Sequence, residues 1–155
     1  MVHEPGTLTY QGFSRSFGAH QNNSQGTSGA NGGGLVFIKA ATLIGNSQSI
    51  QANGSNVNSL SGIDGAGGGG GAGGILLDIN SIQGTLTLQA EGGTGGNVNN
   101  TSHGTGGGGG GGAIWTNAVL PATVTTSVQG GASGTLSSGV PFGSQAGSAG
   151  MLVTG

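Results

Sequence analysis

The sequence lacks most of the features on which folded enzymes and membrane proteins depend. Its 155 residues include no cysteine, only 3 prolines, 4% charged side chains and 4% aromatic side chains. Without cysteine there is no disulfide to stabilise the chain, and the redox compartment stays open. No segment approaches the roughly eighteen apolar residues that a membrane-spanning helix needs. The first ten residues also lack the charged-then-apolar order of a signal peptide.

The shortage of charge excludes further classes. The net charge is −2, and Arg15 and Lys39 are the only basic residues besides histidine. Proteins that bind nucleic acid or anionic membranes by electrostatics need clustered lysine and arginine. We therefore expect neither a nucleic-acid partner nor membrane insertion.

Glycine is present in excess, with 40 residues. Collagen is excluded because glycine does not recur at every third position and proline is scarce. Disorder is the other default, since ordering a glycine costs roughly 0.5 to 1 kcal/mol more than ordering an alanine. However, the apolar residues are concentrated at matching positions of a repeat, which a solvated linker does not require.

The repeat is clearest over residues 65–91, where a glycine run precedes a short apolar strand, a turn and an alternating strand with Leu86, Leu88 and Ala90. Equivalent apolar strands recur at intervals of 40, 39 and 37 residues. Such a period predicts stacked units whose equivalent residues form columns. The first predicted core column consists of Leu35, Ile75, Ile114 and Met151. The second consists of Val36, Leu76, Trp115 and Leu152.

Glycines at equivalent places reopen each glycine-rich run and set the repeat boundaries, at Gly26, Gly65, Gly104 and Gly143. They divide one repeat domain into units 26–64, 65–103 and 104–142, with partial units 1–25 and 143–155. Residues 7–11 have the alternating pattern of a further strand. We interpret the chain as a piece of a longer protein.

The fold class that follows is all-β, a glycine-rich parallel β-solenoid with a repeat of about 39 residues. Residues 35–40 form a continuous apolar run, which is typical of a strand buried on both faces. The glycine runs are expected to form a third face, either as extended chain or as polyproline-II-like helices. Lys39 is expected at a strand edge with its head group in water.

The stretch GGILLDINSIQGTLTLQAEGGTGGNVNNTSHGTGGGGGGGAIW resembles glycine-rich repeat regions of very large bacterial surface proteins, including the adhesins of gliding Bacteroidetes. Those regions combine glycine runs, an apolar strand and a GGxGGN turn. Residues 35–54, with the glycines before them, are also similar to glycine-rich segments of secreted bacterial proteins and phage tail adhesins. The resemblance implies export, a cell-surface or filament location, and a role in adhesion, scaffolding or gliding motility. It transfers no catalytic residue.

The titratable residues do not form a recognisable catalytic or metal-binding motif. Asp64 and His103 each precede an equivalent loop glycine, so stacking would bring them near each other as a metal or acid/base pair. The matching positions Gln25 and Phe142 supply no third ligand, so two solvated loop residues are the simpler interpretation. A calcium-binding β-roll needs aspartate where this chain has asparagine. We predict no catalytic residue, no metal and no cofactor.

The variable loops are the remaining candidates for contact with a partner. Asn97, Asn99, Asn100 and His103 form a possible contact loop, although the asparagines are also typical turn formers or a polar ladder between units. Trp115 is interpreted as a core residue rather than a sugar-stacking one. The expected partners are other copies or neighbouring repeats, and surface glycans. The favoured role is a non-catalytic structural or adhesive module; a phage-tail-like receptor-binding tip and a polysaccharide-acting β-helix enzyme are alternatives.

Overall fold

The computed structural model describes residues 26–62 and 64–155. These residues contain no helix and form seven strands, all of them paired in parallel. The expected strand at residues 7–11 lies outside the described residues. The strands are β1 (Leu35–Ile44), β2 (Gln48–Gln51), β3 (Gly74–Gln83), β4 (Leu86–Gln89), β5 (Ala113–Thr116), β6 (Val124–Ser127) and β7 (Met151–Thr154).

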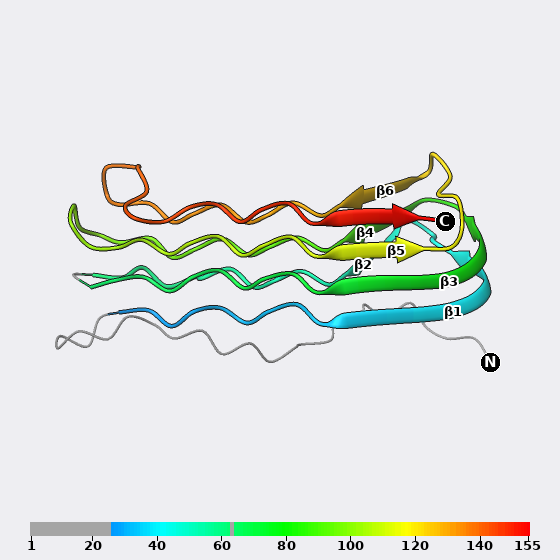
Figure 1. Ribbon diagram of the computed structural model, residues 1–155, viewed down its shortest axis with the longest axis horizontal. Coiled ribbons are helices and arrows are strands. Elements are labelled where there is room, and N and C mark those ends of the chain that lie inside the picture. The colour runs from blue at the N-terminus through cyan, green and yellow to red at the C-terminus, as the bar shows by residue number, and fades with distance from the viewer. Residues whose placement is uncertain (1–25, 63) are drawn as a thin grey trace.

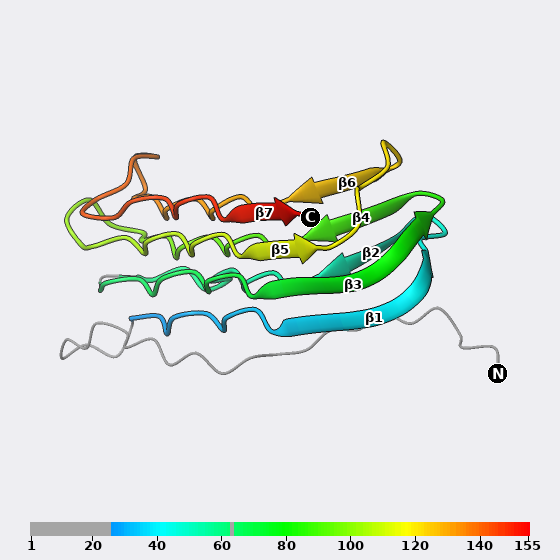
Figure 2. The ribbon, with the colours of Figure 1, turned by 45° about the vertical axis from the view of Figure 1, so that its right-hand side comes forward.

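Two parallel sheets face each other, one in the order β1-β3-β5-β7 and the other in the order β2-β4-β6. Strands that follow one another in the chain never pair. Each strand pairs instead with its counterpart in the next unit, so the chain winds as a solenoid of stacked rungs (Figures 1 and 2). The predicted parallel β-solenoid with a repeat of about 39 residues is therefore confirmed.

A tight turn joins the two strands in each of the first two rungs. In the first rung Asn46 and Ser47 adopt positive φ angles of 45° and 59°, and in the second rung Gly84 adopts a φ of 76°. The amide of Gln48 donates to the carbonyl of Gly45 at 2.8 Å, which closes the first turn. Asparagine and glycine tolerate the left-handed region best, so Asn46 and Gly84 reverse the chain at little steric cost.

The core lies between the two sheets. The predicted alternating strand is confirmed, because Leu86, Leu88 and Ala90 are all buried. Their partners from the opposite sheet are Val36, Ile75, Leu77, Ile79 and Ile114. Each large side chain that is removed from water here contributes about 1.5–3 kcal/mol of hydrophobic free energy, so these columns are the main driving force for stacking.

The predicted core columns are wrong by one residue at both ends of the stack. Leu35 and Met151 are 64% and 61% exposed, and they pair with Gly74 and Ala113 rather than with Ile75 and Ile114. The first residue of the apolar run is an outward-facing one in the first and last rungs, so aligning the runs by their first residue shifted the register. The inward column is Val36, Ile75, Ile114 and Leu152. Leu152 lies in the last described rung and is 42% exposed, so the prediction that it is a core residue is also wrong.

The same one-residue error in register puts two of the four residues of the second predicted core column on the wrong face. Successive strand residues point to opposite faces, so a shift of one residue moves a side chain from the core to the outside. Leu76 and Trp115 pair with each other on the outer face, where Leu76 is exposed and Trp115 is half-buried. The prediction that β1 is buried on both faces is also wrong, because Phe37 is 58% exposed.

The glycine runs do not form a third face. They continue the line of the strands and extend each rung away from the sheets, as the wavy segments to the left of the strands in Figure 1 show. Each rung therefore has a strand half and a glycine half. In the glycine half, the run that enters the strands lies antiparallel to the run that leaves them, as the bonds Gly93 to Gly70 and Gly96 to Gly67 show.

Hydrogen bonds in the glycine half follow a period of three residues. The amides of Ala66, Gly69 and Ala72 donate to Gly104, Gly107 and Gly110 of the next rung, at 2.8–3.0 Å. The residues that follow Gly69 and Ala72 donate across to the leaving run of the previous rung, as Gly70 does to Ser55 at 2.9 Å. Three residues per turn without bonds inside the segment is the pattern of a polyproline-II helix, so of the two conformations expected, this is the one present.

Close approach, rather than unusual backbone angles, explains the glycine content. A Cβ atom on Gly70 would lie 1.8 Å from the carbonyl oxygen of Asn31, and one on Gly109 would lie 1.9 Å from that of Gly70. At Gly68 and Gly107 the nearest atom would be 3.5 Å away. Glycine is thus required at the positions of Gly70 and Gly109, where neighbouring backbones touch, whereas the positions of Gly68 and Gly107 face outward. The remaining position of each turn holds Gly69 but also Ala66 and Ala72.

Candidate functional surface

The predicted contact loop connects the second and third rungs at the end of the molecule farthest from the strands (Figure 1). The side chains of two of its four residues form hydrogen bonds that stabilise the fold. The Oδ1 atom of Asn97 accepts the amide of Thr135 in the next rung at 2.8 Å. The Oδ1 atom of Asn100 accepts the amides of Thr101 and Ser102 at 2.6 and 3.0 Å. The expectation of turn formers and a ladder between units is confirmed for these two residues.

The other two residues of the loop are available for contact. Asn99 is exposed, and its backbone amide donates to Ser61 of the previous rung at 2.8 Å. His103 is half-buried. Within the described part of the chain neither side chain makes a hydrogen bond. A role in binding a partner stays a prediction for Asn99 and His103.

Asp64 and His103 do not form a pair. Asp64 is 5% exposed, its Oδ1 atom accepts the amide of Gly65 at 2.7 Å, and its carbonyl accepts the hydroxyl of Ser61 at 2.5 Å. These bonds fix the turn between the first and second rungs. Across residues 26–62 and 64–155 there is no group of three side chains that could hold a metal ion. The carboxylate of Asp64 therefore stabilises the turn.

Sequence reasoning missed a set of asparagines that cap the glycine-rich helices. The Oδ1 atoms of Asn53 and Asn56 accept the amides of Glu91 and Thr94, one rung further on, at 2.8 and 2.7 Å. In a helix with three residues per turn, one amide in three points away from both neighbouring segments. The asparagine from the rung before satisfies it. The spacing of three between Asn53 and Asn56 was the available signal.

We expect Asn56→Ala to lower the free energy of unfolding by about 0.5–1.5 kcal/mol, the usual net contribution of one hydrogen bond. The substitution removes the acceptor for the Thr94 amide. Urea denaturation measures the loss. Asn99→Ala is the matched control, because the Asn99 side chain makes no hydrogen bond to residues 26–62 or 64–155, and it should unfold at the wild-type midpoint. Equal losses in both variants would contradict the capping role.

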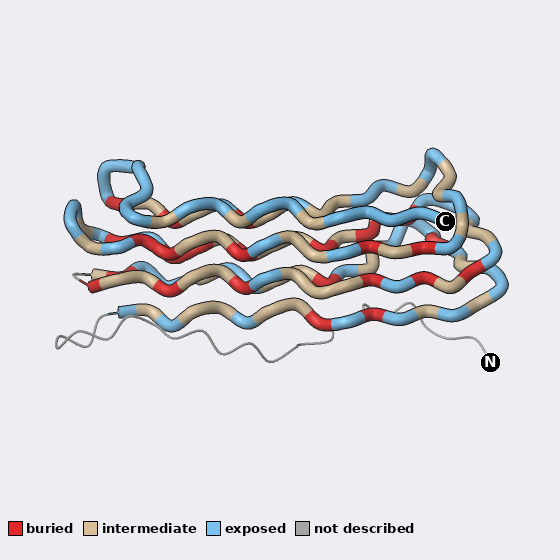
Figure 3. Tube along the Cα trace, viewed as in Figure 1, coloured by how far each residue is buried: buried red, intermediate tan, exposed pale blue. Residues whose placement is uncertain are grey.

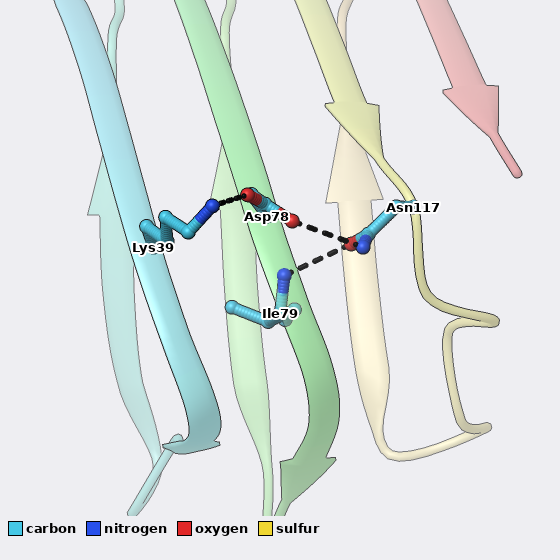
Figure 4. Close-up of polar contacts among 4 residues, drawn as sticks. All are labelled: Lys39, Asp78, Ile79 and Asn117. Atoms are coloured by element: carbon cyan, nitrogen blue, oxygen red, sulfur yellow. Dashed lines mark hydrogen bonds and ion pairs between the residues drawn. The ribbon is translucent and has the colours of Figure 1, made fainter.

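A polar column crosses three rungs on the outer face of the larger sheet (Figure 4). The Nζ atom of Lys39 lies 2.8 Å from Oδ2 of Asp78, and Nδ2 of Asn117 donates to Oδ1 of the same carboxylate at 3.1 Å. The Oδ1 atom of Asn117 accepts the amide of Ile79 at 2.9 Å. Asn117 follows the last residue of β5, so its side chain satisfies an amide of the longer strand β3. Lys39 lies within β1 rather than at a strand edge, although its side chain is 75% exposed as expected.

The ion pair raises the pKa of Lys39 above its ordinary value of 10.5, chiefly through the hydrogen bond to Asp78 and also through the charge of that carboxylate. A raised folded-state pKa means that the contribution of the pair is complete below pH 10.5 and is lost as the pH rises through the folded value. We expect NMR titration of the Lys39 side chain to show a midpoint above 10.5, which Asp78→Asn returns towards 10.5. A midpoint unchanged by Asp78→Asn would contradict the pairing.

One depression among the described residues needs consideration as a binding site. It lies in the first rung between residues 26–30 and 56–59, with a volume of about 340 Å³. Its lining consists of backbone and small polar or apolar side chains without a titratable group. In the described part of the chain we find no helix that could traverse a bilayer.

Comparison with known proteins adds no relative. No protein-family model matches the chain, and neither a curated protein nor a solved structure shows significant similarity to it. The class that the structure defines is therefore a glycine-rich parallel β-solenoid.

Proposed function

We propose that the chain is a non-catalytic structural and adhesive repeat module of a bacterial extracellular surface filament or adhesin. The observation that carries the proposal is the continuity of rung-to-rung hydrogen bonding. Parallel strand pairing in one half of each rung passes directly into bonds between glycine-rich helices in the other half. A chain bonded in this way over its whole width acts as a rod rather than as a tether.

The bonding pattern supports a mechanical role. Backbone hydrogen bonds between rungs run along the direction of stacking, and they act in parallel across each pair of rungs. Between the first and second rungs, β1 and β3 are in register over nine residue pairs, and the glycine halves add further bonds such as Ala30 to Gly68 and Gly33 to Gly71. Separating two rungs requires breaking these bonds together, so the stack resists extension.

The described acids support the absence of catalysis. Glycoside hydrolysis needs two carboxylates about 5–10 Å apart across a bound sugar. Asp64 holds a turn, Asp78 pairs with Lys39, and Glu91 accepts the hydroxyl of Ser127. Each carboxylate is already bonded within the fold. This arrangement favours the structural module over a polysaccharide-acting enzyme; Glu4 lies outside the described residues.

The resemblance of the glycine-rich stretch to bacterial surface adhesins supports the extracellular location, and the exposed Asn99 with the half-buried His103 offers a contact surface for glycans or a receptor. A receptor-binding tip would depend on these loop residues, whereas a rod would depend on the stacking of rungs.

Immunogold labelling of intact cells of the source organism with antibodies against the chain tests the proposal. We expect gold on the surface or along filaments without prior lysis. Labelling that requires lysis would overturn the extracellular role. A glycan array then separates rod from tip: binding abolished by Asn99→Ala with His103→Ala indicates a tip, whereas surface labelling without such binding supports the rod.

A further inference from the structure

The two sheets present different surfaces to the outside. Outward positions of the sheet β2-β4-β6 carry small or polar side chains, namely Ser49, Gln51, Thr87, Gln89, Thr125 and Ser127. Outward positions of the sheet β1-β3-β5-β7 carry an apolar row in register across all four strands, formed by Phe37, Leu76, Trp115 and Val153. We call this row, together with Leu35 and Met151 beside it, the apolar stripe. The chain thus builds one solvated face and one apolar face from the same repeat.

The apolar stripe is larger than scattered exposure would produce. Leu76 and Val153 are 37% and 41% exposed, in addition to the higher values of Leu35, Phe37 and Met151. Together these side chains expose roughly 500 Å², within the size range of the largest apolar patches on soluble proteins, which commonly mark interaction sites. Figure 3 shows exposed residues along β1 and β7, the two outer strands of this sheet.

We infer that the apolar stripe packs against the apolar stripe of a second copy of this chain, so that two solenoids lie side by side. The inference deepens the proposed function and rests on it, because it names the lateral partner of the rod. Flat sheets pack face to face about 10 Å apart, and a two-fold axis lets one patch serve both partners. The repeat makes the stripe regular, which suits another sheet.

Charge favours a copy over a charged partner. Next to the stripe the described charged residues of this face are Lys39 and Asp78, which neutralise each other. Two such faces meet without net repulsion, and a two-fold arrangement can place Lys39 of one copy near Asp78 of the other. This face has no net charge that would attract a strongly basic or acidic partner.

The buried area sets the strength of the association. A stable interface buries about 800 Å² on each partner, and the stripe of four rungs supplies roughly 500 Å² of apolar surface. We therefore expect reversible pairing with a dissociation constant on the order of micromolar or weaker. Each additional rung would extend the stripe and tighten the pairing.

The sole tryptophan of the chain reports on this face directly, because Trp115 lies within the stripe. Sedimentation velocity of the full chain from about 1 μM to about 1 mM should show a monomer–dimer equilibrium. The Trp115 emission should move to shorter wavelength over the same range. Phe37→Lys should raise the dissociation constant at least tenfold and keep the monomer emission. Gln51→Lys, an exposed strand position of the same rung on the polar sheet, should leave both readouts unchanged.

Three outcomes would overturn the inference. One is a monomer at every concentration. Another is association that leaves the Trp115 emission unchanged and resists Phe37→Lys, which would assign contact to the open strand edges. The third is a monomer that dimerises only after removal of residues 1–25, which would make that segment the occupant of the stripe. If Phe37→Lys fails to fold by circular dichroism, Val153→Lys tests the same stripe at the outer strand β7.

This experiment is independent of surface labelling. Labelled filaments with a strictly monomeric chain would leave the proposed function standing and remove lateral pairing. Dimers through the stripe without surface labelling would do the reverse.

Discussion

Gly109→Ala should destabilise the protein severely, whereas Gly107→Ala, two residues away in the same glycine run, should be tolerated. A Cβ on Gly109 would lie 1.9 Å from the carbonyl oxygen of Gly70 and 2.5 Å from its carbonyl carbon. Both contacts are with backbone, which cannot rotate away as a side chain can. The rung would have to separate from its neighbour, with loss of bonds such as Gly109 to Gly93.

We expect Gly109→Ala to cost about 3 kcal/mol or more, at the upper end of the range for overpacked interiors. In a chain of this size that lowers the melting temperature by about 10 °C. At Gly107 the nearest atom to an added Cβ is the carbonyl oxygen of Gln145 at 3.5 Å. Alanine there also restricts the unfolded chain, so stability should stay the same or rise by up to about 1 kcal/mol.

Thermal and urea denaturation of the two variants measure the difference. Both substitutions add one methyl group to the same run, so helix or strand propensity cannot separate them. Equal effects of Gly107→Ala and Gly109→Ala would show that the glycine halves of the rungs are not in backbone contact.

Leu77→Ala should cost about 2–5 kcal/mol, the range for a large-to-small change in a packed core. Leu77 is 0% exposed and points between the two sheets, where it packs in the same cluster as Leu88. Leu76→Ala is the matched control, because Leu76 is the preceding residue of β3 and is 37% exposed on the outer face. We expect the control to change stability by less than about 1 kcal/mol.

Urea midpoints of these two variants, measured at low protein concentration to keep the chain monomeric, decide which face of β3 is the core. The alignment by run starts placed Leu76 in a core column, and the observed register places it outside. A larger loss of stability for Leu76→Ala than for Leu77→Ala would instead support the alignment by run starts, which places Leu76 in the core.

Period and strand order were predictable because they follow from recurrence along the chain. The alternating strand around Leu86 and Leu88 was predictable for the same reason, since every second residue is apolar and faces inward. The register of the longer strands was not. In β1 both Leu35 and Val36 are apolar, so hydrophobicity does not say which of them faces the core.

Equal spacing would have settled the register. The inward residues Val36, Ile75, Ile114 and Leu152 follow one another at 39, 39 and 38 residues, which is more regular than the 40, 39 and 37 of the run starts. A stack of parallel rungs demands nearly constant spacing, because each residue must meet its counterpart in the next layer.

The position of the glycine runs could not be predicted from composition. Glycine can form a third face or continue a strand with equal ease, and neither choice leaves a side-chain pattern. The hydrogen bonds from the asparagine side chains could not be predicted for a related reason. The bond from the Asn53 side chain to Glu91 connects residues 38 positions apart, and asparagine in a polar loop reads first as a turn former.

The repetition of hydrogen bonds from layer to layer has a consequence for how such a chain can change in length. The carbonyls that accept the amides of Gly69 and Gly70 have equivalents one period later, which accept the amides of Gly108 and Gly109. Each rung therefore offers the next rung the same donors and acceptors that the previous rung offered to it. If one whole period were lost or duplicated, the rungs on either side of the change would still match in their hydrogen-bond donors and acceptors. A gene that encodes such a chain can therefore shrink or grow by recombination between its own repeats, and the product would still fold.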